Sequence, residues 1–174
     1  DCKGLTGVTI PNSVREIEES AFYGCYALAS ITIPDNVETV GKTAFSMCFS
    51  LASVTIGAGV SSIGEEAFSM CSELESLTVS ESNAAYKSVN DVLFNKQGTV
   101  LLCFPGKKAG NYMIPEGVEE IATYAFAGNT RLVSVIMPQS VTSVGNAVFW
   151  GCSDLNSVTM GNGVSTIGQY VFGS

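Results

Sequence analysis

Six cysteines are the residues of this 174-residue chain with the widest chemical potential, because thiols can form disulfides, bind metals or act as nucleophiles. Five of them hold one repeat position, three residues before a leucine that recurs along the chain. In a stacked coil such side chains point the same way, whereas a disulfide needs two side chains turned toward each other. We therefore expect a structural column of free, buried thiols. Its members are Cys2, Cys25, Cys48, Cys71 and Cys152, with Asn129 in the same place in one unit.

Asn129 could hydrogen-bond the backbone of the neighbouring loop from that position. Cys103 stands outside the column and has no evident partner. The chain has no Cys-x-x-Cys pair and no histidine, so we expect neither a metal site nor a cofactor.

The motifs typical of enzymes are incomplete. Histidine, the commonest general base, is absent. The Gly-x-Gly segments at 57–59 and 161–163 lack the third glycine of a dinucleotide loop and open no helix. The carboxylate pairs at 18–19, 65–66 and 119–120 occupy polar turns of the repeat and indicate solvated positions. The sequence therefore predicts no catalytic residues and a protein that is not an enzyme.

Composition narrows the possible partners. Hydrophobic residues make up 46% and charged residues 14% of the chain, which predicts a folded protein with a buried core. With 8 basic and 16 acidic residues, the formal net charge is −8, which argues against nucleic acid and anionic lipid surfaces. No apolar run approaches the roughly 18–20 residues of a membrane span, and the first residues are not a signal peptide.

An internal repeat sets the architecture. Leucine recurs every 23 residues at Leu5, Leu28, Leu51 and Leu74, and the interval returns at Leu132 and Leu155. Each leucine precedes a segment such as Val-Thr-Ile, whose period of two predicts a short strand with threonine outward. Proline ends this segment in four units, at Pro11, Pro34, Pro115 and Pro138. The segment from the next valine to an Ala-Phe pair is too short and polar for a full helix, so a turn of 3₁₀ type is expected.

A single unit cannot offset the entropy of ordering its backbone, so the units must stack into a solenoid. We predict an α/β-type solenoid: a right-handed coil with one parallel β-sheet face, turns and 3₁₀ segments on the other face, and one β-hairpin insertion. It would be a single domain over 1–174, expected to be part of a longer array. The units are 5–27, 28–50, 51–73, an irregular 74–108, 109–131, 132–154 and a partial 155–174.

The pattern Cys-x-x-Leu-x-x-Ile-x-Ile-Pro-x-x-Val-x-x-Ile-x-x-x-Ala-Phe resembles the BspA-like leucine-rich repeat of bacterial surface proteins. Residues 86–89, 92–96 and 101–105 are similar to that family's irregular repeat. The resemblance covers nearly the whole chain and implies a leucine-rich-repeat fold without catalytic residues. It also implies a cell-surface or secreted protein that adheres to host or matrix proteins or to other cells. The departures are Asn129 at the cysteine position and Gly57, Ser80 and Gly161 at the proline position.

Three features are candidate binding surfaces. The outward threonines of the strands, Thr32 and Thr55 among them, could form a flat face, although threonine is also simply a good exposed strand residue. Tyr23, Tyr26, Phe49 and Trp150 stand where other units carry serine, threonine or alanine, so they could be interface anchors or could pack on a turn.

The third feature is the insertion, which reads as a hairpin around 95–98 and brings Lys96, Lys107 and Lys108 to an acidic scaffold. It could be a binding loop or a structural spacer.

These features together favour a non-catalytic, adhesin-like protein-binding module. Two alternatives stay open at this point: a structural spacer within a surface protein, and a glycan-binding surface for which Tyr23, Tyr26 and Trp150 are the support.

Overall fold

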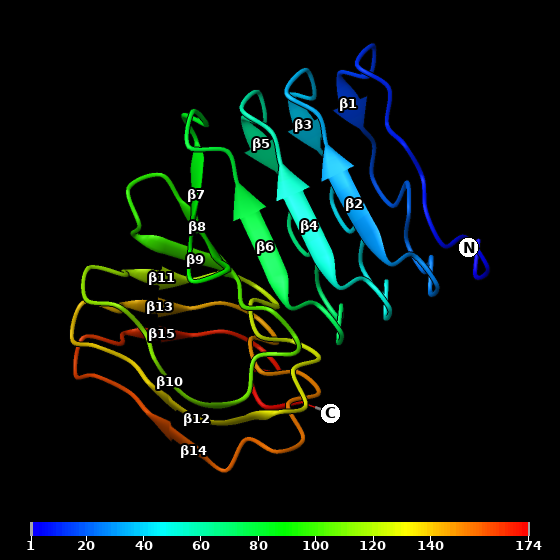
Figure 1. The fold of residues 1–174 in the computed structure, drawn as a ribbon. Helices are drawn as coiled ribbons and strands as arrows, with labels where there is room; N and C mark the ends of the chain where they lie inside the picture. The colour runs from blue at the N-terminus through cyan, green and yellow to red at the C-terminus, as the bar shows by residue number, and fades with distance from the viewer. Residues whose placement is uncertain (1, 174) are drawn as a thin grey trace.

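The computed structural model describes residues 2–173, and these form a β-solenoid of about seven turns. The strands of successive turns lie side by side, and the stack changes direction near its middle (Figure 1). We refer to residues 2–80 as the first half and to residues 110–173 as the second half. The predicted solenoid is confirmed.

The Val-Thr-Ile segments of the first half form the sheet that their period of two predicts. Its three parallel strands are β2 (Ser30–Ile33), β4 (Ser53–Ile56) and β6 (Ser76–Val79). In β2 the side chains of Ile31 and Ile33 are buried and that of Thr32 is exposed, because successive residues of a strand face opposite sides. The repeat leucines before these strands are completely buried beneath them.

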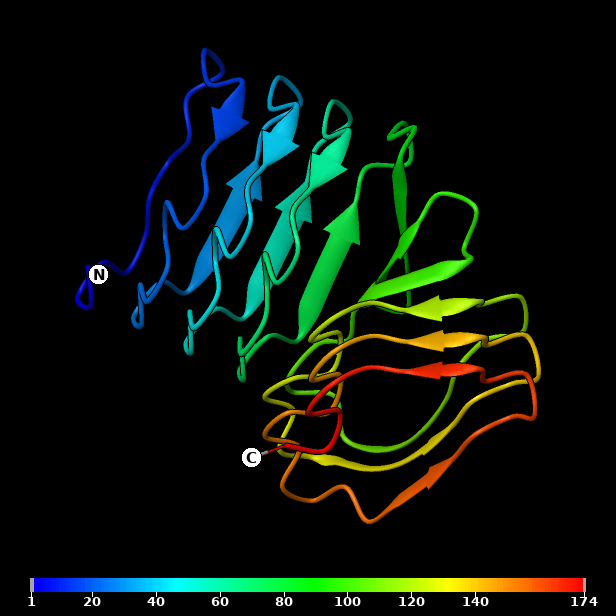
Figure 2. The same ribbon diagram turned by 180° about the vertical axis from the view of Figure 1, so that it is seen from behind.

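A second parallel sheet forms another wall of the coil, where the sequence analysis expected only turns (Figure 2). In the first half its strands are β1 (Glu16–Ile17), β3 (Thr39–Val40) and β5 (Ser62–Ile63). Each has only two residues, one polar and one apolar, so no alternation is long enough to reveal a strand in the sequence. The prediction of a single sheet face is therefore wrong.

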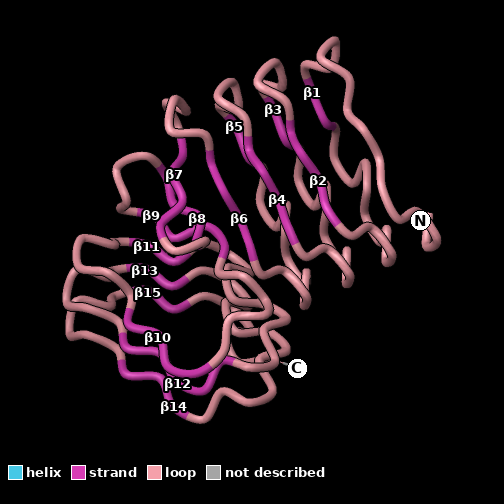
Figure 3. The backbone as a smooth tube through the Cα atoms, in the orientation of Figure 1, coloured by secondary structure: helices cyan, strands magenta, loops and turns pink. Residues whose placement is uncertain are grey.

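The turns after these short strands contain two left-handed residues per unit, one on each side of the repeat phenylalanine. The residue two positions before it has a φ between 48° and 61° at Ser20, Thr43, Glu66, Tyr124, Ala147 and Tyr170. The residue two positions after it has a positive φ at Gly24, Met47, Met70, Gly128 and Gly151. A 3₁₀ helix needs consecutive residues near −50 to −70°. Residues 2–173 accordingly contain neither 3₁₀ nor α-helix (Figure 3), and the predicted α/β class and 3₁₀ turns are not confirmed.

The second half repeats the same two-walled plan. One parallel sheet comprises β10 (Gly110–Met113), β12 (Leu132–Ile136) and β14 (Ser157–Thr159). The other wall contains β11 (Glu120–Ile121), β13 (Ser143–Val144) and β15 (Thr166–Ile167). The strands of this wall run across the direction of β2, β4 and β6 (Figure 1).

The irregular unit places an antiparallel three-stranded meander between the halves. Its strands are β7 (Tyr86–Val89), β8 (Val92–Asn95) and β9 (Val100–Cys103). The hairpin between β8 and β9 is the predicted one, and it is confirmed; β7 adds a third strand. Because β9 also pairs in parallel with β11, the meander continues one wall of the second half.

Two separate clusters of buried side chains fill the coil, one in each half. A row of phenylalanine rings in contact accompanies each cluster: Phe22, Phe45 and Phe68 in the first half, and Phe104, Phe126, Phe149 and the exposed Phe172 in the second. The meander contributes to both clusters, because Leu93 and Cys103 belong to the first and Val92, Phe94 and Leu101 to the second. The insertion is therefore a buried joint between the halves.

Candidate binding surface

The outer face of β2, β4 and β6 carries only serine and threonine. Its members, here called the serine–threonine face, are Ser30, Thr32, Ser53, Thr55, Ser76 and Thr78. The three threonines are exposed and pair across neighbouring strands, with the Thr78 hydroxyl 3.4 Å from that of Thr55. None of these strands contains a charged residue. The face consists of small, uncharged side chains, which suits close approach of another surface, and Asp91 borders it at β6, where its carboxylate lies 3.5 Å from the Ser76 hydroxyl.

An aromatic group lies in the turns that precede these strands. Tyr26 and Phe49 lie in the turns before β2 and β4, and their rings stack with centroids 5.0 Å apart. The Lys3 ammonium lies 5.4 Å from the centroid of the Tyr26 ring, within cation–π range. The Tyr23 hydroxyl lies 3.0 Å from the Met47 sulfur. We call Tyr23, Tyr26 and Phe49 the aromatic edge.

The rings of the aromatic edge are only partly covered. Tyr23 and Phe49 each keep 37% of their surface exposed, and Tyr26 is half-buried. Stacking therefore holds the rings of Tyr26 and Phe49 in place, and the contact with Met47 holds Tyr23, without removing the rings from solvent, as an interface anchor requires.

Trp150 does not join the aromatic edge. It lies in the second half, half-buried, with its ring edge-to-face against Tyr170 at a centroid separation of 6.5 Å. The space beside Gly173 is filled by the same indole. Of the four aromatic residues that the sequence singled out, the structure thus places Tyr26 against Phe49, Tyr23 against Met47 and Trp150 against Tyr170.

The lysines of the irregular unit form hydrogen bonds and ion pairs within the chain. Lys96 donates hydrogen bonds to the backbone carbonyls of Glu81 and Asn83. Lys108 forms an ion pair with Asp91 at 3.4 Å. Asp91 also accepts a hydrogen bond from the Ser76 hydroxyl at 3.5 Å, so the Lys108–Asp91 pair lies beside the β6 end of the serine–threonine face.

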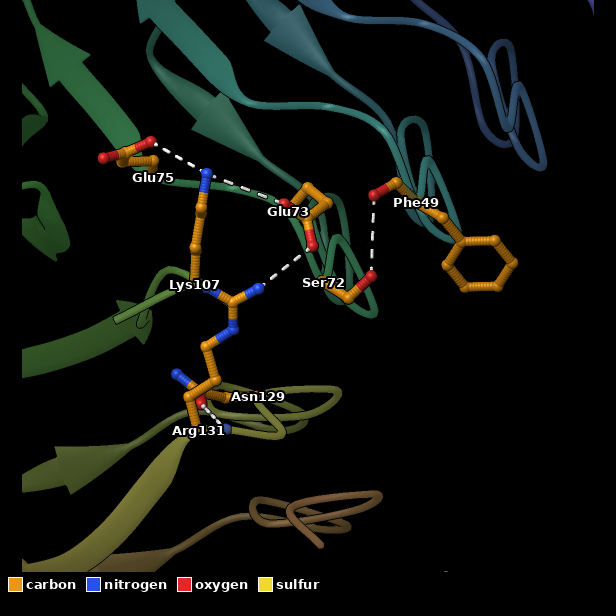
Figure 4. Close-up of polar contacts among 7 residues, drawn as sticks. All are labelled: Phe49, Ser72, Glu73, Glu75, Lys107, Asn129 and Arg131. Carbon is orange, nitrogen blue, oxygen red and sulfur yellow. Dashed lines mark hydrogen bonds and ion pairs between the residues drawn. The ribbon is translucent and has the colours of Figure 1, made fainter. Parts of the chain in front are cut away.

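Lys107 sits in a small charged cluster across the joint (Figure 4). Its ammonium lies 3.2 Å from a carboxylate oxygen of Glu75 and 3.6 Å from one of Glu73. Arg131 of the second half approaches Glu73 from the other side, at 3.4 Å. Side-chain exposures between 33% and 69% keep each of these pairs weak, so the cluster orients the halves more than it stabilises them.

The cysteine column connects successive turns through hydrogen bonds. The thiols of Cys48, Cys71 and Cys152 each donate to the carbonyl of the phenylalanine in the preceding turn, at 3.2 Å. Cys25 is also buried, whereas Cys2 is exposed. Asn129, in the same repeat position, donates to the carbonyls of Pro105 and Lys108.

Burial raises the pKa of four thiols, those of Cys48, Cys71, Cys103 and Cys152. The pKa is raised to about 11 for Cys48 and to about 12 for Cys152 and Cys103. For Cys71 burial raises it as well, with the nearby thiol of Cys48 as the next cause. Because the thiolate is the nucleophile, these groups are inert near neutral pH.

A thiol-specific chromogenic disulfide reagent should therefore label Cys2 quickly in the native protein at pH 8, and Cys48, Cys71 and Cys103 only after unfolding. Since unfolding restores a pKa near 9, the unfolded chain loses these protons first, and stability should fall as pH rises from about 9 toward 11–12. The measurement is thiol labelling with and without denaturant, in the absence of reductant. Fewer than six reactive thiols in denaturant would show that disulfides form.

A shallow groove of about 740 Å³ crosses the carboxyl ends of β2 and β4. Its lining is rich in hydroxyl, amide and carboxylate groups, including Thr9, Asn12, Thr32, Asp35 and Asn36. One oxygen of Asp35 accepts the Ala58 N–H at 2.7 Å, which fixes the carboxylate at the groove. Such a surface offers hydrogen bonds to a polar ligand.

Over residues 2–173, no helix is long and apolar enough to cross a membrane. Within the same range, no group of three or more histidine, cysteine, aspartate or glutamate side chains is placed to hold a metal ion.

Known proteins share this architecture. A leucine-rich cell surface protein of Faecalibacterium prausnitzii is 30% identical, with a TM-score of 0.72, over 94% of this chain and 50% of that one. The pneumococcal vaccine antigen PcpA is 22% identical, with a TM-score of 0.71, over 91% of this chain and 51% of the antigen. A leucine-rich repeat protein of T. pallidum is 25% identical, with a TM-score of 0.57, over 94% and 72% of the two chains.

This chain spans about half the length of the first two of these proteins. No curated protein matches it significantly. The family model for the BspA type leucine rich repeat region matches residues 1–100 and 102–174, in six copies. With the repeat matched along both halves and the fold shared with leucine-rich surface proteins, the chain belongs to the BspA type leucine-rich-repeat family.

Proposed function

We propose that the chain is a non-catalytic, adhesin-like module that binds a protein through the aromatic edge and the adjoining serine–threonine face. The parent protein would be exposed on a cell surface or secreted, as the name of the Faecalibacterium prausnitzii relative supports. The partner would be a host or extracellular-matrix protein. Affinity would come from contact area and a few aromatic anchors, since the surface is open.

The exposure of Tyr23 and Phe49 carries this proposal. Other units place Ser46 and Ser69 at the position of Tyr23, and Ser72 at the position of Phe49, and still fold into the same turn. The core therefore does not require these rings. Half-exposed tyrosine and phenylalanine beside an uncharged sheet are typical of interface centres, where such residues supply most of the binding energy.

The repeat itself supplies a mild variant to test the aromatic edge. In Tyr23→Ser/Tyr26→Ser/Phe49→Ser, each ring is replaced by the residue that neighbouring units carry, so the fold should be kept. The wild type is screened against extracellular-matrix and host-surface proteins beside a glycan array. We expect saturable, micromolar binding to a protein, weakened at least about tenfold in the variant.

The matched control removes exposed apolar surface elsewhere. Met113→Thr/Ile136→Thr changes two exposed residues of β10 and β12 to the threonine that the first sheet carries, and its affinity should stay within about twofold of wild type. Equal losses in both variants would place the site outside the aromatic edge. No binding at tens of micromolar to any protein or glycan would support the spacer function instead.

A glycan-binding function is the second candidate, and the groove at the carboxyl ends of β2 and β4 is the observation that favours it. Asp35 and Asn36 could hydrogen-bond sugar hydroxyls there, with Ile33 and Pro34 as apolar neighbours. Binding that free sugar competes away, and that Asp35→Ala abolishes while the triple serine variant does not, would favour this candidate over protein binding.

A further inference from the structure

A crevice of about 200 Å³ lies where the second sheet of the first half meets the meander and β11. Its floor is apolar and comes from both halves and the meander, with Phe68 from the first half, Leu93 and Leu102 from the meander and Ala122 from the second half. The buried thiol of Cys103 also lines it and stays uncharged, since burial raises its pKa to about 12. The crevice therefore exists only because the irregular unit sets the two halves against each other.

Carboxylates surround this apolar floor. Glu65 and Glu66 follow β5, and Glu120 lies in β11, 54 residues after Glu66 in the sequence. Lys42 reaches Glu65 and Glu66 only at 4.0 and 3.9 Å, with half of its own side chain in solvent. Glu120 forms no ion pair among residues 2–173. Three acids against one distant base leave the rim negative.

We propose that this crevice receives a lysine side chain of the protein partner, an inference that rests on the proposed protein-binding function. The apolar floor fits the four-carbon stem, and the carboxylates of the rim attract the ammonium. Lysine presents a compact charge that can be reached from several directions, which matches carboxylates supplied by the turn after β5 and by β11. The overall net charge of −8 also attracts a basic surface of the partner toward this chain.

The probe is N-acetyl-lysine methylamide, titrated into the folded chain while the methyl resonances of Ala67, Leu93, Leu102 and Ala122 are followed by NMR. We expect saturable shifts confined to the crevice, with a dissociation constant on the order of millimolar that rises with salt. N-acetyl-norleucine methylamide, which keeps the stem and lacks the ammonium, should shift the same methyls at least about threefold more weakly.

Two variants test the carboxylates. Glu66→Gln/Glu120→Gln should weaken the lysine probe by about tenfold or less and leave the norleucine probe unchanged, because only the charge is removed. Glu119→Gln is the matched control: the residue is exposed and adjacent in sequence but does not line the crevice, and its affinity should equal that of wild type. Thermal unfolding of each variant verifies that the fold is kept.

The outcomes separate this inference from the proposed function. Equal binding of both probes, or no shift at the crevice methyls, would overturn the lysine site even when a protein partner is found. A partner whose affinity is insensitive to Glu66→Gln/Glu120→Gln would overturn it as well. Lysine binding at the crevice without any protein partner would instead refute the proposed function and leave the chemistry of the crevice standing.

Discussion

Replacing Phe94 by alanine is expected to lower the free energy of unfolding by about 3–5 kcal/mol and to loosen the second half first. Phe94 is 3% exposed and belongs to the core of the second half. Its neighbour Leu93 is 1% exposed and belongs to the core of the first half. Adjacent residues of β8 thus serve opposite cores, because successive side chains of a strand point to opposite faces.

Leu93→Ala is the counterpart. It should cost about 2–5 kcal/mol and increase amide exchange mainly in β4, β5 and β6, whereas Phe94→Ala should do so in β11, β12 and β13. Urea unfolding gives the stability and hydrogen exchange gives its location. Val89→Ala, at a position of β7 that is 45% exposed, is the control and should change stability by no more than about 0.5 kcal/mol.

Exchange that rises uniformly in both variants would contradict the assignment of these two residues to separate cores. It would mean that the solenoid unfolds as one cooperative unit despite the two clusters. The expected local response follows from the stacking of the units, since each turn contacts only its neighbours and the meander is where the two stacks meet.

The long repeat strands could be predicted from the sequence because burial leaves a clear pattern there. Ile31, Thr32 and Ile33 alternate as a half-buried strand must, and the same alternation returns at each 23-residue interval. The two-residue strands could not be predicted in this way. Glu16 and Ile17 pair with Thr39 and Val40 only because the stack places one turn on the next.

The left-handed turn conformation could not be predicted from the sequence, for another reason. Gly24, Gly128 and Gly151 point to a left-handed position, but Met47 and Met70 hold that position in other units. The left-handed position two residues before the phenylalanine carries no glycine in any unit and holds residues such as Ser20 and Thr43. Side chains that are uncommon at positive φ conceal the feature that rules out a 3₁₀ helix.

The candidate surfaces likewise differ in how far the sequence could predict them. Tyr26 and Phe49 could be paired from the sequence, because equivalent residues of neighbouring units must lie side by side in a solenoid. The ion pairs of Lys107 and the crevice at Glu120 depend on how the two halves meet. That geometry is set by the meander, whose third strand has no counterpart in the repeat and so no period from which to infer it.

Replacing Asn129 by alanine is expected to cost about 3–5 kcal/mol, although no apolar contact of any size is lost. Its amide nitrogen donates to the carbonyls of Pro105 and Lys108 at 2.9 and 2.8 Å. Its side-chain oxygen accepts the N–H groups of Arg131 and Leu132 at 2.9 and 2.8 Å. The side chain is fully buried, so the substitution removes these bonds from the four backbone groups; the Pro105 carbonyl keeps a second bond, from the Lys108 N–H at 3.2 Å.

Asn156→Ala is the control, because this asparagine is exposed and makes no side-chain hydrogen bond among residues 2–173; its effect should stay within about 0.5 kcal/mol. Asn129→Cys gives the sharper comparison, since cysteine holds this position in the regular units. A thiol can donate one weak hydrogen bond to a carbonyl and cannot serve the other three groups. Chemical denaturation should therefore find Asn129→Cys within about 1 kcal/mol of Asn129→Ala.

A comparison with Asn83 explains why asparagine replaces the cysteine of the repeat at position 129. Asn83 is buried at the entry to the meander and makes the same four-bond arrangement, with the carbonyls of Gly57 and Val60 and the N–H groups of Ala85 and Tyr86. One asparagine therefore ties down the backbone on each side of the irregular unit, where the loops no longer satisfy one another. If Asn129→Cys were as stable as wild type, the asparagine would be an incidental replacement in the column, and the exit from the meander would have to be held by other contacts.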